Sequence, residues 1–264
     1  MSADGKFKDL TARTLSAIVM IVVGVTAIWA GGLWFLALCA AIAGLIAWEL
    51  ARMVSPDNRM EVPLGIVSAA AVFAAAFAPI GVAVPGLLIP AIAGGILLSR
   101  HKALYVAYAI LALLASFGLF ILRDAYGLVW VGWLIAVVVM SDVAGYFAGR
   151  ILGGPKFWPT VSPKKTWSGT VAGWIGAFMI GLVVMQMTGA GPVLLILSVL
   201  MSFAGQMGDI AESAIKRKMG VKDSSNLIPG HGGVMDRFDA MLGASVFLFV
   251  VEFLIVFPPT GAAP

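Results

Sequence analysis

The chain has 264 residues, of which 61% are hydrophobic and only 11% are charged, and its mean hydropathy is +1.03. Soluble globular domains have roughly 45–50% apolar and about 25% charged residues, so this composition excludes a soluble domain, and it also excludes a disordered chain. The apolar runs are continuous and do not alternate in polarity, which argues against a membrane β-barrel. The composition therefore predicts an all-α, polytopic integral membrane protein.

Nine apolar stretches have the length of a membrane-spanning helix, which takes roughly 17–25 mostly apolar residues. In chain order they lie near residues 14–30, 33–51, 63–79, 81–98, 104–122, 126–148, 169–187, 191–208 and 238–257. The first has a longer apolar core than a signal peptide and no clear cleavage site. We therefore expect one integral membrane unit, with N-terminal transmembrane helices over 1–125 and a C-terminal catalytic region over 126–264.

The basic residues predict the orientation of these nine helices. With nine spans, 16 of the 17 Lys and Arg residues fall on one face, and only Arg123 falls on the other. The positive-inside rule makes the crowded face cytoplasmic, so the N-terminus and the charged loops are expected inside and the C-terminus outside. The 16 residues are Lys6, Lys8, Arg13, Arg52, Arg59, Arg100, Lys102, Arg150, Lys156, Lys164, Lys165, Lys216, Arg217, Lys218, Lys222 and Arg237.

The loop over 209–239 holds ten of the chain's Asp, Glu, Lys and Arg residues. Its start is expected to continue the eighth helix and to end near Gly220, with Asp209, Glu212 or Ser213, and Lys216 on one helix face. Glycines 230, 232 and 233 then surround His231 in a loop whose backbone N–H groups could cradle phosphate oxygens. Asp236 and Asp239 follow, three residues apart, where the ninth helix begins.

This pattern is typical of a phosphate site with a metal ion. Carboxylate oxygens suit Mg²⁺, which takes one or two carboxylates and completes its shell with phosphates and waters. The neighbouring cations could neutralise a polyphosphate, and phosphoryl-type transfer requires positioning and electrostatic stabilisation from the protein.

Each part of the pattern also has a purely structural explanation. Asp236 and Asp239 are compatible with helix capping, and the Lys216–Lys218 run with anchoring at lipid headgroups. Asp142 could pair with Arg150 or face a cleft. Glu49, at the inner end of the second stretch, is interpreted as a side chain that extends to the membrane–water interface.

Taken together, the motifs resemble a known family. Ser213-x-Ile215-Lys216-Arg217, Lys222-Asp223-x-Ser225 and Ile228-Pro229-x-His231-Gly232-Gly233-x-x-Asp236-Arg237-Phe238-Asp239 are similar to the signature of phosphatidate cytidylyltransferases, also called CDP-diacylglycerol synthases. The upstream Ser162-Pro163-Lys164-Lys165-Thr166-Trp167-Ser168-Gly169 and Gly205-Gln206-x-Gly208-Asp209-x-x-Glu212-Ser213 are likewise similar. The resemblance covers roughly residues 140–257, whereas the first 120 residues resemble the family only in being helical and apolar.

The resemblance implies a reaction in which CTP and phosphatidic acid give CDP-diacylglycerol and pyrophosphate, with Mg²⁺, alone or with a second cation, as cofactor. It implies membrane lipids as partners, no nucleic acid, and a bacterial inner membrane. A homo-oligomer is left open as a further partner, and the oligomeric state cannot be read from the sequence. Two alternatives remain: a membrane cytidylyltransferase acting on another lipid phosphate, and a solute transporter.

Residue roles follow as hypotheses. Asp209 and Asp236 are the expected metal ligands, and Asp223 and Asp239 are second choices. The remaining residues are expected to contact phosphate groups, the basic side chains by charge and the others by hydrogen bonds, with metal ligation as the alternative for Ser213. They are Lys164, Lys165, Ser213, Lys216, Arg217, Lys222, His231, Gly232, Gly233 and Arg237.

Overall fold

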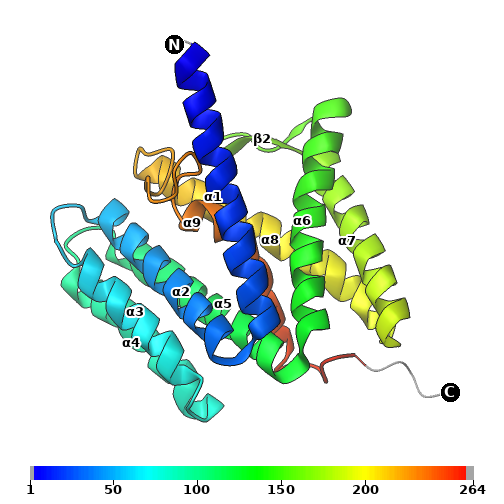
Figure 1. The fold of residues 1–264 in the computed structure, drawn as a ribbon, viewed down its shortest axis with the longest axis horizontal. Helices are drawn as coiled ribbons and strands as arrows, with labels where there is room; N and C mark the ends of the chain where they lie inside the picture. Colours follow the sequence, from blue (N-terminus) through cyan, green and yellow to red (C-terminus); the bar gives the residue numbers. More distant parts are fainter. Residues whose placement is uncertain (1–2, 260–264) are drawn as a thin grey trace. The chain divides into compact units, whose positions relative to one another are not determined.

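The computed structural model describes residues 3–259, with side chains from residue 11 onward, and over this range the chain forms nine helices and one β-hairpin (Figure 1). The helices are α1 (Ala3–Ala30), α2 (Gly32–Val54), α3 (Glu61–Ala75), α4 (Ile80–Leu97), α5 (Lys102–Tyr126), α6 (Leu128–Ile151), α7 (Trp167–Thr188), α8 (Val193–Lys218) and α9 (Met235–Val251). The hairpin pairs β1 (Lys156–Trp158) with β2 (Ser162–Thr166) in antiparallel fashion.

Each helix coincides with one of the nine apolar stretches, so the prediction of an all-α polytopic protein is confirmed. Among the described residues, seven helices are long and apolar enough to cross a membrane, namely α1, α2 and α4 to α8. The other two are shorter: α3 has 15 residues and α9 has 17. At 1.5 Å per residue α3 rises about 22 Å, less than the roughly 30 Å of a hydrocarbon core. The count of nine spans therefore stays a prediction.

The position at which a helix ends was predicted correctly for α8 but not for α3. The apolar run was predicted to reach residue 79, but α3 ends at Ala75. The helix could not continue to residue 79, because the residue directly before Pro79 is disfavoured in the helical conformation. The predicted extension of α8 past its apolar part is confirmed, since the helix continues to Lys218 and Gly220 follows with a φ of +71°.

The chain divides into two compact units. Unit 1 comprises Met1–Phe120 and Lys218–Phe238, and unit 2 comprises Ile121–Arg217 and Asp239–Pro264. The loop between α8 and α9, residues 219–234, falls in unit 1 with the N-terminal helices, and we call it the loop of unit 1. The boundary expected near residue 125 stays a prediction. Within unit 1, α2 and α3 pack with their backbones in contact: a Cβ on Gly44 would lie 2.7 Å from the Gly65 carbonyl oxygen.

In unit 2 the hairpin presents the lysines of the Ser162–Gly169 motif. The hairpin itself was not predicted, because β1 has only three residues and β2 contains a proline. Thr166 ends β2 and caps α7, where its hydroxyl accepts a hydrogen bond from the Gly169 backbone N–H at 3.2 Å. This cap fixes Lys164 and Lys165 immediately before the helix.

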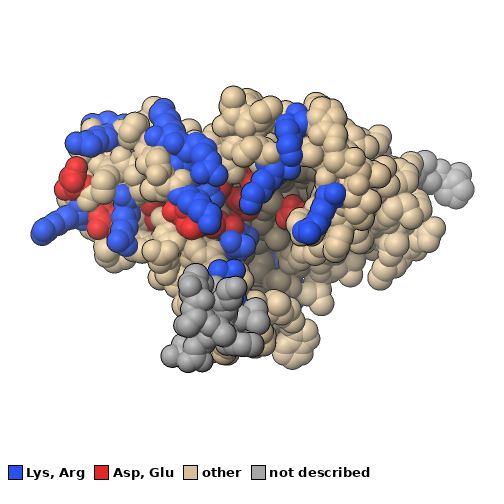
Figure 2. All heavy atoms as spheres, turned by 90° about the horizontal axis from the view of Figure 1, so that it is seen from above, with Lys and Arg blue, Asp and Glu red and all other residues tan. Residues whose placement is uncertain are grey.

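Charged side chains are concentrated at helix ends and loops, whereas the long helices expose apolar side chains. Leu15, Ile21 and Trp29 on α1 are 62%, 63% and 73% exposed. In the view of Figure 2, blue and red side chains stand out against a surface that is mostly tan. Such a distribution is expected for helices surrounded by lipid with polar ends in water.

Candidate active site

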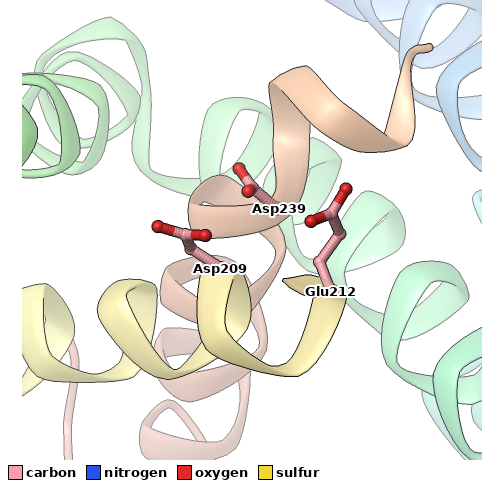
Figure 3. A group of neighbouring side chains, drawn as sticks. All are labelled: Asp209, Glu212 and Asp239. Atoms are coloured by element: carbon pink, nitrogen blue, oxygen red, sulfur yellow. The ribbon is translucent and has the colours of Figure 1, made fainter. Parts of the chain in front are cut away.

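Three carboxylates meet in unit 2. Asp209 and Glu212 come from α8 and Asp239 from α9, and one oxygen of each lies within 4.8 Å of the others. Figure 3 shows the three side chains projecting from neighbouring turns of the two helices. Glu212 is fully buried, and the other two are half-buried. We call these three residues the acidic cluster; among the described residues it is a group that could hold a metal ion.

Glycines bring α8 and α9 close enough to form the acidic cluster. A Cβ on Gly208 would collide with the backbone oxygen of Asp239, and a Cβ on Gly243 would collide with that of Ala204. One turn away, a Cβ on Gly205 would lie 3.1 Å from the Ala240 oxygen. The two backbones are therefore in direct contact beside the carboxylates.

Cations and a hydroxyl border the acidic cluster. The ammonium group of Lys216 lies 2.6 Å from a carboxylate oxygen of Glu212, four residues earlier on α8. The Ser213 hydroxyl donates to Asp209 at 3.3 Å. These contacts place Asp209, Glu212, Ser213 and Lys216 together, as their helical spacing predicts. Lys165 from β2 also reaches Asp209, with 2.5 Å between its Nζ and a carboxylate oxygen.

A cavity of about 500 Å³ opens beside Asp209, within unit 2. Its walls come from α6, the hairpin, the first turn of α7 and α8. The charged and amide side chains that line it are Asp142, Arg150, Lys164, Lys165, Gln206 and Asp209. Its volume lies in the range of small-molecule binding sites, which is about 300–1,000 Å³. Asp142 therefore faces the cavity, one of the two positions that its sequence left open.

Glycines also form part of the cavity wall. A Cβ on Gly169 of α7 would lie 2.6 Å from the Gly145 oxygen of α6, and a Cβ on Gly149 would lie 2.9 Å from the Thr166 hydroxyl. Side chains there would separate α6 from the start of α7. The small residues of the cavity wall thus keep the lysines of β2 next to α6.

The remaining signature residues lie in the loop of unit 1. One oxygen of Asp236 accepts hydrogen bonds from the Ser224 N–H at 2.9 Å, the Ser224 hydroxyl at 2.9 Å and the Gly233 N–H at 2.7 Å. These contacts close the loop at the first turn of α9. Asp236 is not one of the three carboxylates of the acidic cluster, and its predicted role as a metal ligand stays a prediction.

His231 also has loop-forming contacts. Its Nδ1 lies 2.8 Å from the Ser16 hydroxyl of α1, and its carbonyl oxygen accepts from the Arg237 guanidinium at 2.9 Å. Gly230 and Gly232 on either side have φ of +74° and +85°, a region that favours glycine. Other predicted phosphate contacts are exposed: Lys164, Arg217 and Lys222, together with the second-choice metal ligand Asp223.

Two acidic residues were missed as site residues. Glu212 was noted for its helix face and as part of a motif but was given no role, although its position three residues after Asp209 was a sufficient signal for a shared ligand group. Glu49 on α2 is completely buried, and its carboxylate lies within hydrogen-bonding distance of three donors of the loop of unit 1 and of the Met235 N–H at the start of α9. The signal was a single carboxylate within an apolar run, but sequence alone could not reveal its distant partners.

Comparison with known proteins agrees with the motifs. Residues 11–255 match the cytidylyltransferase family. Phosphatidate cytidylyltransferases of Brucella suis biovar 1 (strain 1330) and of Bacillus subtilis (strain 168) are each 42% identical, over 142 and 138 residues. That of Helicobacter pylori (strain ATCC 700392 / 26695) is 40% identical over 141 residues.

These alignments cover 50–53% of the chain and 48–53% of the relatives, so the chain spans about half the length of the curated relatives it matches. The family match is much longer and includes both the acidic cluster and the loop of unit 1. The chain therefore belongs to the cytidylyltransferase family.

Proposed function

We propose that the protein transfers the cytidylyl group of CTP to phosphatidic acid, giving CDP-diacylglycerol and pyrophosphate. The observation that carries the proposal is the acidic cluster next to a cavity that contains Lys164, Lys165 and Arg150. Family membership and the names of the relatives support the same reaction.

The reaction needs little covalent chemistry from the protein. An oxygen of the phosphatidic acid phosphate attacks the α-phosphorus of CTP, and the bond from that phosphorus to the oxygen bridging to the β-phosphorus breaks. Pyrophosphate leaves with the electron pair. The attacking phosphate monoester is already largely ionised, because its second pKa is near 6, so no general base is required. We accordingly assign His231 to loop support.

The cavity lysines would neutralise and orient the phosphates of the two substrates. Lys165 is held by Asp209 and donates to the Gln206 carbonyl oxygen at 3.3 Å, so its ammonium group is fixed between the cavity and the acidic cluster. Lys164 is exposed beside it, and Arg150 lines the cavity from α6. Fixed cations at phosphate oxygens stabilise charge that moves during the transfer.

The acidic cluster fits a hard divalent cation such as Mg²⁺. Three carboxylates within 4.8 Å repel one another, and oxygen donors at this spacing suit such an ion. Asp209, Glu212 and Asp239 would hold it, and it would supply positive charge for the triphosphate. Lys216 and Lys165 border the acidic cluster and moderate the repulsion.

Incubating the purified protein with radiolabelled CTP and defined lipid phosphates tests the proposal. We expect label in the organic phase with phosphatidic acid, in stoichiometric amounts with released pyrophosphate. Incorporation only with an isoprenoid phosphate would favour the alternative lipid substrate. Uptake of a solute into vesicles without nucleotide transfer would support the transporter.

The proposed topology places the hairpin and the loop of unit 1 on the cytoplasmic face of a bacterial inner membrane. In a Cys39→Ala background, single cysteines at the exposed Thr160, Asn226 and Thr188 test it. A membrane-impermeant thiol reagent should label Thr188→Cys in intact cells, and the other two only after the cells are opened. Labelling of Thr160→Cys and Asn226→Cys from opposite sides of the membrane would contradict the proposed topology.

A further inference from the structure

Glu49 connects the N-terminal helices to the loop of unit 1, residues 219–234, which we call the signature loop because it carries signature residues. One carboxylate oxygen accepts from the Ser225 hydroxyl at 2.6 Å and from the Val234 N–H at 2.8 Å. The other accepts from the Met235 N–H at 2.7 Å and lies 3.1 Å from the Ser224 hydroxyl. All four donors belong to the loop or to the first residue of α9, whereas Glu49 lies near the end of α2.

The position of this carboxylate explains a glycine of the signature. A Cβ on Gly233 would collide with the Glu49 carboxylate and with the Ser224 hydroxyl. Glycine is therefore required at this position because Glu49 fills the space next to its backbone. The contact links a residue outside the recognised motifs to one inside them.

The energetics favour a dedicated role for Glu49. A fully buried carboxylate is unfavourable unless hydrogen bonds compensate for its lost hydration, and bonds to a charged acceptor are stronger than neutral ones. Two of the four donors are backbone N–H groups at the start of α9, where the helix has no internal acceptors. The positive end of the helix dipole favours a negative charge at the same place.

We propose that Glu49 is a positioning residue that holds the signature loop and the first turn of α9 in the geometry needed for nucleotidyl transfer. The proposal rests on the proposed function. Ser224 shows how the effect is transmitted, since its hydroxyl lies within hydrogen-bonding distance of both Glu49 and Asp236. The N-terminal helices thereby hold the signature loop within unit 1 through a buried carboxylate.

Glu49→Gln tests the proposal, because it keeps the size of the side chain but replaces one acceptor oxygen with an NH₂ group that faces donors. The turnover number per folded molecule should fall at least about tenfold, since displacing catalytic groups by 1 Å can cost about a hundredfold. Hydrogen–deuterium exchange should accelerate at Val234 and Met235, with the protection of α2 and α3 retained. Glu61→Gln, at the start of α3, is the matched control and should resemble the wild type.

Wild-type protein assayed in parallel separates this proposal from the proposed function. If the wild type itself does not convert CTP and phosphatidic acid, the function fails, while the exchange measurement still tests the loop contact. Wild-type turnover in Glu49→Gln, or loss of protection throughout unit 1, would overturn the positioning role.

Should Glu49→Gln not accumulate in the membrane, Ser225→Ala removes one donor from the loop side. It should accelerate exchange at Val234 and lower turnover, and an unchanged turnover would overturn the role.

Discussion

Asp209→Asn should lower turnover by at least about a hundredfold, the scale of losing one electrostatic contact in a transition state. Asp209 belongs to the acidic cluster and holds Lys165 at the cavity, so the substitution weakens both metal binding and lysine placement. Activity of the wild type should vanish with EDTA and return with Mg²⁺. Steady-state assays across a Mg²⁺ titration would measure both effects.

Asp239→Asn and Asp236→Asn refine the ligand assignment. The acidic cluster predicts that Asp239→Asn raises the Mg²⁺ concentration needed for half-maximal activity. Asp236→Asn should raise it only if Asp236 is also a ligand, as its sequence position suggested. An unchanged Mg²⁺ requirement in both Asp209→Asn and Asp239→Asn would dismiss the acidic cluster as the metal site.

Lys165→Met should reduce kcat/KM for CTP by about a hundredfold, because it removes a fixed cation from the cavity that we assign to phosphate binding. The Lys165 side chain is 24% exposed, and its ammonium group is positioned by Asp209 and by the backbone carbonyl oxygen of Gln206. Methionine keeps much of the aliphatic length, so the change mainly tests the charge.

Lys156→Met on the neighbouring strand β1 provides the control for Lys165→Met. Lys156 is exposed and does not line the cavity, so its replacement should leave kcat/KM close to the wild-type value. An equal loss of kcat/KM in Lys165→Met and Lys156→Met would show that only the total positive charge of the hairpin matters, and not the position of Lys165. Comparable membrane levels, measured by immunoblot, would exclude an effect on insertion.

Most of the fold was predictable because lipid imposes a simple rule on sequence: spanning segments must be long and apolar. That rule found every helix, and the polar extension of α8 followed from helical spacing. It did not find the early end of α3, which depends on local backbone preferences near Pro79. Nor did it predict the β-hairpin, whose short strands have no periodicity to detect.

The candidate site was predictable only as a set of residues. Asp209, Lys216 and Ser213 are neighbours through one helix, so their spacing was sufficient. The proximity of Asp239 to Asp209, and that of Lys165 to Asp209, depends on which helices pack together. Glu49 illustrates the limit most clearly, since 175 residues separate it from Ser224.

If the acidic cluster holds a metal ion, the contact between α8 and α9 would make its preference for ion size depend on Gly208, a residue without a side chain. Gly208 lets the Asp239 backbone approach α8, and any Cβ there would push the two helices apart. Mg²⁺ requires oxygen donors at about 2.0–2.1 Å, whereas Ca²⁺ accepts about 2.3–2.6 Å and more ligands. A wider spacing between the carboxylates would therefore shift preference toward the larger ion. Discrimination between Mg²⁺ and Ca²⁺ would then depend as much on Gly208, which precedes Asp209, as on the carboxylates themselves.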